Sequence, residues 1–141
     1  MHTLTSDEAQ GILAAAIQTL KAQFKVAAVS IVNRDGTEIA KVVMDGVKSA
    51  SANVATLKAK QAAWRGKSTA ETRDEIGAGK ITAEVLGIDP KQLVPWAGGM
   101  PIYDKEGNLL GGIGVSNLAQ EEDEMVAKSA VCKEGFKVVK A

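Results

Sequence analysis

Hydrophobic residues follow two different spacings along this chain, and the two spacings alternate. Between Thr5 and Phe24 the apolar positions recur every three or four residues, at Ile12, Leu13, Ala16, Ile17 and Leu20. Glu8 follows Thr5 at the spacing of a capping box, so this pattern predicts a helix over residues 6–23. The next two runs, residues 26–32 and 39–44, are largely β-branched or apolar and flank Asp35-Gly36, which predicts a hairpin.

The same alternation continues to the C-terminus. Alanine-rich residues 51–65 predict a second helix ending at Gly66, and shorter helices are expected at 69–75 and 82–86. A second hairpin is expected at 100–103 and 109–115, and a last helix at 120–136 with acids in its first turn. This order of elements predicts an α+β fold with an antiparallel sheet, formed by residues 1–141 as a single domain.

Residues 94–116 hold more glycine than a hairpin needs. Two glycines, Gly98 and Gly99, precede the first apolar run, and Gly111, Gly112 and Gly114 lie inside the second. We expect the three later glycines to let a helix or a neighbouring subunit lie close to the strand. We expect Gly98 and Gly99 at the rim of a ligand pocket, where backbone N–H groups can face an anion or carbonyl; a β-bulge or a tight packing contact also explains them.

Charge and composition exclude several classes of protein. Lysine and arginine number 17, as do aspartate and glutamate, so the chain lacks the basic footprint of a nucleic-acid-binding protein and has little self-repulsion against self-association. One cysteine, Cys132, and one histidine, His2, exclude an internal disulfide and a zinc site with the usual ligands. The absence of a membrane-length apolar run and of a signal-peptide pattern predicts a cytoplasmic protein with no membrane partner.

Lys58 is the first candidate for chemistry, because its small or apolar helix neighbours favour burial of its stem. A desolvated lysine can be a general base, a Schiff-base amine or an anion anchor, whereas a snorkelling lysine keeps its ammonium group in water. Asp123 and Glu124 begin the last helix, where one of them can orient Lys58 or move a proton. Neighbouring helical side chains diverge, so the two acids do not share one role, and both also suit the helix dipole.

Four further side chains are candidate ligand contacts. Trp64 and Trp96 can stack on a flat ligand, or they pack in the core or a subunit interface. Gln61 lies on the same broad side of the second helix as Trp64. Asp45 can reach a ligand from the end of the first hairpin, although Asp-Gly is also a common turn sequence.

Four segments carry a resemblance to a known family. They are "MDG" at 44–46, "LKAKQAAWRGKST" at 57–69, "GGMPIYDKEGNLLGGIGVS" at 98–116 and "EEDEMVA" at 121–127. Together they resemble the GlcG/HbpS family, which includes the PduO C-terminal type, over nearly the whole chain. The resemblance implies a profilin-like fold, with a central antiparallel sheet of about five strands flanked by helices. It also implies homo-oligomers from dimers to octamers, and haem or a related tetrapyrrole as the ligand of some members.

This chain departs from the haem-binding members of that family. Their haem contacts include histidine, whereas His2 is the sole histidine here. Gln61 stands where many members have threonine, and Trp64 where they usually have phenylalanine. Other side chains can ligate haem iron by their chemistry, and their spacing selects none of them: Met44, Met100, Met125, Tyr103 and Cys132.

Three functions are compatible with these observations. Family resemblance favours an oligomeric small-molecule-binding protein whose ligand is haem or a related tetrapyrrole. The shortage of haem ligands favours the other two. One is a cofactor-independent isomerase or tautomerase of a catabolic pathway, in which Lys58 polarises a carbonyl or carboxylate and Asp123 or Glu124 moves the proton. The other is a structural or chaperone-like subunit without chemistry.

Overall fold

The computed structural model describes residues 2–140 and has one antiparallel sheet at its centre. Its strands are β1 (Ala28–Asn33), β2 (Glu38–Val43), β3 (Gly99–Tyr103) and β4 (Leu109–Ser116), in the order β2-β1-β4-β3. The helices are α1 (Ser6–Ala22), α2 (Ser49–Arg65), α3 (Thr69–Gly77), α4 (Ala83–Leu86) and α5 (Gln120–Lys133), with a 3-10 turn η1 (Pro90–Gln92) before β3. The predicted α+β class and the antiparallel sheet are confirmed.

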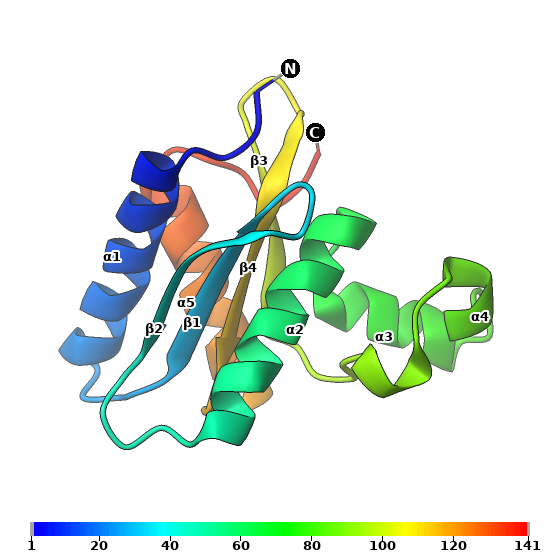
Figure 1. The fold of residues 1–141 in the computed structure, drawn as a ribbon, viewed down its shortest axis with the longest axis horizontal. Coiled ribbons are helices and arrows are strands. Elements are labelled where there is room, and N and C mark those ends of the chain that lie inside the picture. Colours follow the sequence, from blue (N-terminus) through cyan, green and yellow to red (C-terminus); the bar gives the residue numbers. More distant parts are fainter. Residues whose placement is uncertain (1, 141) are drawn as a thin grey trace.

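Helices cover both faces of the sheet (Figure 1). α1 and α5 pack against each other on one face, with α1 over β1 and β2 and α5 over β3 and β4. α2 crosses the other face, where it contacts β1, β3 and β4. α3 and α4 extend away from the sheet beyond α2. The architecture therefore has three layers, and α2 alone separates most of one sheet face from solvent.

The sheet of residues 2–140 has four strands, not the roughly five that the resemblance implies. The chain returns beside β3 near its C-terminal end, where Tyr103 and Lys137 exchange two backbone hydrogen bonds of 2.8 and 2.9 Å. That contact remains an isolated bridge, because the segment after α5 does not continue the ladder along β3. It nevertheless covers part of the β3 edge, whereas β2 is the open edge of the sheet.

The two faces of the sheet are closed by different side chains. Large aliphatic residues fill the layer under α1 and α5, among them Ile12, Leu20, Ile31, Ile102, Leu110, Ile113 and Val131. Small residues line the layer under α2. A Cβ added at Gly112 would meet the backbone oxygen of Ala59, and one at Gly114 would meet that of Ala55. The expectation that a helix lies against the strand glycines is thus confirmed for these two, while Gly111 lies against Val32 of β1.

The helix boundaries follow local sequence signals. The capping box at α1 is present: Thr5 Oγ1 accepts from Glu8 N at 3.1 Å, and Glu8 Oε1 accepts from Thr5 N at 2.9 Å. Gly66, with φ of 65°, ends α2 where expected. The last helix ends at Lys133 and not near residue 136, because Gly135 adopts φ of 86° and turns the chain.

Candidate functional site

α2 carries two adjacent stripes of side chains, and each stripe faces a different cavity. Residues three or four apart lie on the same side of a helix, which defines the stripes. The first consists of Leu57, Lys60, Gln61 and Trp64, and the second of Ser51, Val54 and Lys58. The sequence placed Gln61 and Trp64 on one broad side of the helix, and both line the first cavity, whereas Lys58 lines the second.

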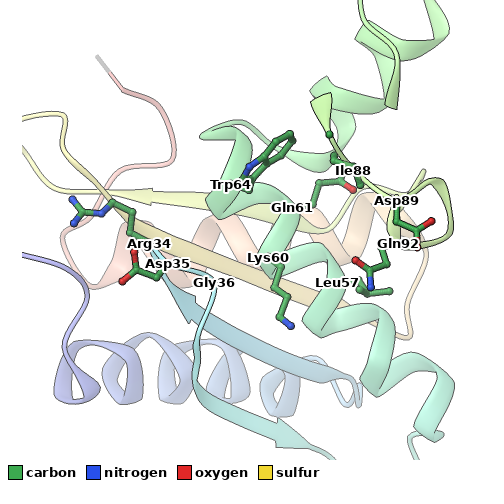
Figure 2. A pocket seen from close by; sticks show the side chains of 11 residues that line it. Arg34, Asp35, Gly36, Leu57, Lys60, Gln61, Trp64, Ile88, Asp89 and Gln92 are labelled. Atoms are coloured by element: carbon green, nitrogen blue, oxygen red, sulfur yellow. The ribbon is translucent and has the colours of Figure 1, made fainter. Parts of the chain in front are cut away.

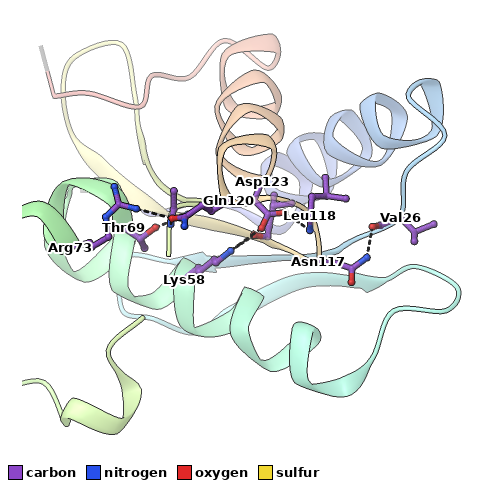
Figure 3. A network of polar contacts seen from close by, with 11 residues as sticks. Val26, Lys58, Thr69, Arg73, Asn117, Leu118, Gln120 and Asp123 are labelled. Carbon is purple, nitrogen blue, oxygen red and sulfur yellow. Dashed lines mark hydrogen bonds and ion pairs between the residues drawn. The ribbon is translucent and has the colours of Figure 1, made fainter. Parts of the chain in front are cut away.

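Lys58 and Asp123 form a buried ion pair at the second cavity (Figure 3). Lys58 Nζ lies 3.1 Å from Asp123 Oδ2, and their side chains are 2% and 3% exposed. The ammonium group also donates to the backbone oxygen of Val115 at 2.9 Å. Asp123 Oδ1 accepts from the Leu118 N–H at 3.1 Å. The structure therefore brings together the lysine and one of the two acids that the sequence proposed as partners.

Close backbone packing creates room for this ion pair. Gly98 has φ of 127°, a conformation that favours glycine. A Cβ at Gly98 would lie 2.7 Å from Lys58 Nζ and 2.9 Å from Asp123 Cβ. Any other residue at this position would therefore displace the ammonium group or the carboxylate, which gives Gly98 a direct role in shaping the site.

Burial shifts the protonation of both members of the pair in the direction of their neutral forms. It lowers the pKa of Lys58 below its ordinary value, against the opposing attraction of Asp123. It raises the pKa of Asp123, against the opposing effects of Lys58 and of the Leu118 N–H. Shifted pKa values of this kind occur at functional sites and also in structural ion pairs.

A short strap, residues 94–98, connects the contact with Gln61 on α2 to the contact with Gln120 on α5 and is held at both ends. Both polar atoms of the Gln61 side chain bind the Val94 backbone, with Oε1 accepting at 2.9 Å and Nε2 donating at 3.3 Å. At the other end, Gln120 Oε1 accepts from Ala97 N at 3.1 Å and from Arg73 Nη1 at 2.7 Å. Gln61, predicted as a ligand contact, thus positions the strap in addition to lining the Trp64 cavity.

The cavity beside the ion pair, which we call the Lys58 cavity, has a volume of about 370 Å³. α2, the strap and the β4–α5 junction form its walls, from residues Ala50, Ser51, Val54, Lys58, Trp96, Ser116, Asn117, Leu118, Gln120 and Asp123. Asn117 has φ of 126°, which is rare outside glycine, and its Nδ2 donates to Val26 O at 2.9 Å. Backbone strain of this kind is common at binding sites.

The second cavity, which we call the Trp64 cavity, has a volume of about 380 Å³ and lies between α2, the β1–β2 turn and the loop after α4. Its walls are Arg34, Asp35, Gly36, Leu57, Lys60, Gln61, Trp64, Gly87, Ile88, Asp89 and Gln92. Figure 2 shows Arg34 and Asp35 at one end and Asp89 and Gln92 at the other. Trp64 is 52% exposed, so its indole can cover a ligand.

Three predicted site residues lie away from both cavities. Asp45 is exposed in the turn after β2, and Glu124 is half-buried on α5 without facing either cavity. The Gly99 N–H donates to Thr69 Oγ1 at 3.0 Å, and Gly99 packs closely against Thr69 and Lys58, which is the tight packing contact that the sequence also allowed. Adjacent helical residues diverge, which explains why α5 buries Asp123 and turns Glu124 outward.

Other cavity residues were missed from the sequence. Lys60 and Leu57 precede Trp64 by four and seven residues, so helical spacing alone was sufficient to find them once Trp64 was chosen. Ser116, Gln120 and Arg34 reach the cavities through tertiary packing of loops and strand ends, which leaves no periodic signal in the sequence.

The fold and these cavities define a class: a three-layer α+β protein with two ligand-sized cavities along its central helix. Comparison with protein families then gives the identification. Residues 4–132 match the family model described as haem degrading protein HbpS-like, and the chain belongs to this family. The resemblance seen in the sequence is therefore confirmed. A comparison with curated proteins finds no match.

Solved structures share the fold over nearly the whole chain. The PduOC:haem complex is 25% identical with a TM-score of 0.85, covering 97% of this chain and 99% of that one. Protein ORFY of Klebsiella pneumoniae is 24% identical with a TM-score of 0.83, covering 95% and 92%. HbpS is 24% identical with a TM-score of 0.82, covering 94% and 91%. At these identities the last two show the fold alone.

Proposed function

We propose that this protein binds a small molecule in the Trp64 cavity, and that the ligand is haem or a related tetrapyrrole. The observation that carries the proposal is the cavity's composition: an exposed indole with Leu57 and Ile88 on its apolar walls, and the cations Arg34 and Lys60 at its edge. A flat apolar ring with two carboxylates complements such walls. Membership of the HbpS-like family, and the haem complex of one structural relative, support the same ligand class.

This cavity suits the porphyrin ring of haem better than it suits the haem iron. None of the residues that line the Trp64 cavity is histidine, cysteine, methionine or tyrosine, the side chains that usually ligate haem iron. His2 lies elsewhere, with its Nε2 3.3 Å from Glu8 Oε1. The Tyr103 hydroxyl donates to Gly66 O at 2.6 Å. The proposal is accordingly for binding of the ring and its carboxylates, and no reaction of the iron is derived.

A titration with two porphyrins tests this proposal. Haemin and iron-free protoporphyrin IX should bind with affinities within about threefold of each other, because the ring and not the iron makes the contacts, and threefold is less than 1 kcal/mol. His2→Ala should leave the Soret band of bound haemin unchanged. The proposal would be wrong if haemin bound about a hundredfold tighter than protoporphyrin, with a sharp six-coordinate spectrum that His2→Ala abolished.

We also propose that the protein self-associates, as a dimer or a larger ring such as an octamer. Several large apolar side chains are exposed on the single chain, among them Phe24 at 97% and Met125 at 66%. Val43, 44% exposed, lies on β2, the open edge strand of the sheet. Exposed apolar groups and an open strand edge favour contact with a second copy. Sedimentation velocity at micromolar concentration should show no significant species of 14.7 kDa, and a sole species of that mass would refute the proposal.

A second candidate function is a cofactor-independent isomerase or tautomerase. Its specific support is the Lys58–Asp123 pair on a cavity wall, with pKa values shifted toward proton exchange. Such an enzyme should exchange the α-protons of a small ketone with D2O faster than buffer does, as followed by proton NMR. Equal rates with and without protein would exclude it.

None of the helices within residues 2–140 is long and apolar enough to cross a membrane, and the cytoplasm remains our predicted location.

A further inference from the structure

The Lys58 cavity offers unused hydrogen-bond donors on a buried wall. Lys58 Nζ has three N–H groups, of which Val115 O and Asp123 Oδ2 accept two. The Ser116 hydroxyl is on a residue 6% exposed, lines the same cavity, and makes no hydrogen bond with any described residue. The NH2 group of Gln120 likewise donates to no described residue, because its amide oxygen is the atom that binds Ala97 and Arg73. A ligand must therefore supply acceptors.

More of the hydrogen-bond acceptors on this wall than of its donors are already in use. Both oxygens of Asp123 accept hydrogen bonds, from Lys58 and from the Leu118 N–H. Gln120 Oε1 accepts from two donors. Asn117 is exposed at the mouth of the cavity, with its amide nitrogen directed to Val26 O. The wall therefore matches an accepting oxygen of a ligand better than a donating hydroxyl or ammonium group.

Charge balance decides between a carboxylate and a neutral carbonyl as that acceptor. The positive charge of Lys58 is matched by Asp123 at 3.1 Å. Arg73, which reaches Gln120, is itself paired with Asp74 Oδ1 at 3.1 Å. A bound carboxylate would add an unmatched negative charge next to a buried aspartate, which costs free energy in a poorly solvated site. A neutral carbonyl oxygen can accept the same hydrogen bonds without that cost.

The remaining walls limit the rest of the ligand. Val54 and Leu118 are apolar, and Trp96, 48% exposed, closes one side from the strap. The strap is fixed at both ends by Gln61 and Gln120, so this wall is positioned before a ligand arrives. A volume of about 370 Å³ with one polar wall and apolar surroundings accommodates a short alkyl chain next to the carbonyl.

We propose that the Lys58 cavity binds a small neutral carbonyl compound, a short-chain ketone or aldehyde, whose oxygen accepts hydrogen bonds from Lys58 and Ser116. The proposal is independent of the tetrapyrrole site. It specifies the substrate class of the candidate isomerase, and any turnover of the bound carbonyl compound rests on that proposed function. Binding and turnover are separate properties, and each has its own measurement.

Two probes of nearly equal shape test the effect of ligand charge separately from the effect of ligand size. Butanone is the neutral ketone, and in propionate a carboxylate oxygen replaces one methyl group. In proton–nitrogen NMR spectra of the labelled protein, butanone should shift the Trp96 indole N–H and the Ser116 amide saturably, with an affinity of about millimolar for so small a ligand. Propionate at the same concentration and pH should leave both signals in place, and the Trp64 indole signal should not respond to either probe.

Variants then test the two donors. Ser116→Ala should weaken butanone binding about fivefold, which corresponds to a hydrogen bond worth about 1 kcal/mol. The double variant Lys58→Met with Asp123→Asn removes both charges together and should abolish binding, while its fold is checked by circular dichroism. Lys128→Met, at an exposed lysine of α5 that lines neither cavity, is the matched control and should leave the affinity for butanone unchanged.

Each outcome bears on one claim. Stronger binding of propionate than of butanone would overturn the charge argument, and unchanged butanone affinity in Ser116→Ala would overturn the assigned donors. The absence of any shift with butanone would overturn the site itself. Butanone binding without exchange of its α-protons in D2O would uphold the site and exclude the isomerase, and neither result depends on porphyrin binding in the Trp64 cavity.

Discussion

The two cavities share helix α2 and differ in where they keep their charges. In the Trp64 cavity, Lys60 is exposed, and its charge helps to lower the pKa of Glu38. In the Lys58 cavity, one lysine and one aspartate are almost completely removed from water and bound to each other. The adjacent residues Leu57 and Lys58 face different cavities, so a single step along the helix separates a cavity with an exposed lysine from a cavity with a buried ion pair. We propose a tetrapyrrole for the first cavity and a small neutral carbonyl compound for the second.

Breaking the buried ion pair should have the largest effect. Asp123→Asn keeps an acceptor for the Leu118 N–H but leaves the Lys58 charge buried without its partner, and should lower the free energy of unfolding by about 3–5 kcal/mol. Adding Lys58→Met should restore most of that loss, because no buried charge remains. Lys60→Met, on an exposed lysine, should change stability by about 0.5 kcal/mol or less. Urea unfolding measures all three, and equal losses in the single and double variants would show that the pair is not coupled.

Moving α2 away from the sheet should have the next largest effect, and it should disturb both cavities. A Cβ at Gly114 would lie 2.7 Å from the Ala59 backbone nitrogen and even closer to the Ala55 oxygen. Backbone atoms cannot rotate aside, so Gly114→Ala should cost about 3 kcal/mol by overpacking. Gly77→Ala is the control, since nothing lies within 4 Å of its added Cβ. Similar unfolding midpoints for the two variants would contradict the close packing of α2 on β4.

Removing either tryptophan should distinguish the cavities in ligand affinity. Trp64→Ala should weaken protoporphyrin binding about fivefold, which corresponds to about 1 kcal/mol of ring stacking. Trp96→Ala should leave that affinity unchanged, because Trp96 lines only the Lys58 cavity. Fluorescence of the bound porphyrin gives both affinities. An equal loss in the two variants would mean that the porphyrin does not discriminate between the cavities.

The smallest expected effect is a pH dependence of the free energy of unfolding, which arises from the Lys58 cavity alone. Burial raises the pKa of Asp123 in the folded protein above the value of about 3.9 that an unfolded chain has. Between these two values the folded state holds a proton that the unfolded state has released. Asp123 therefore makes the free energy of unfolding fall as pH rises through this window. Carbon NMR of the Asp123 carboxyl should show a titration above 3.9, and a midpoint below 3.9 would contradict this account.

Local signals in the sequence were sufficient for much of the fold. The capping box at Thr5, the stop at Gly66 and the turn at Asp35-Gly36 each act within a few residues, and the structure places them where they were expected. The end of α5 was missed, because Gly135 outweighed a continuing apolar pattern. The fifth strand came from the resemblance, whereas the described part of the segment after α5 makes a single isolated bridge, between Lys137 and Tyr103.

The site was predictable only in part, for a physical reason. The small neighbours of Lys58 favoured burial of its stem, and the acids at the start of α5 were candidate partners. Which acid turns inward depends on the rotation of α5 against the sheet, and the sequence does not specify this rotation. The strap of residues 94–98 is held by Gln61 and Gln120, which are distant from it in the sequence. Such long-range hydrogen bonds leave no periodic pattern in the sequence.

The central claim is that α2 separates two sites of different chemistry, and the two tryptophans allow it to be tested directly. Trp64 and Trp96 are the chain's only tryptophans, and each lines one cavity. Their indole N–H signals, assigned with Trp64→Phe and Trp96→Phe, can be followed while protoporphyrin IX and butanone are added in either order. The account predicts that protoporphyrin moves the Trp64 signal, that butanone moves the Trp96 signal, and that neither ligand changes the affinity of the other. Competition between the two ligands, or a shift of both indoles by butanone, would contradict it.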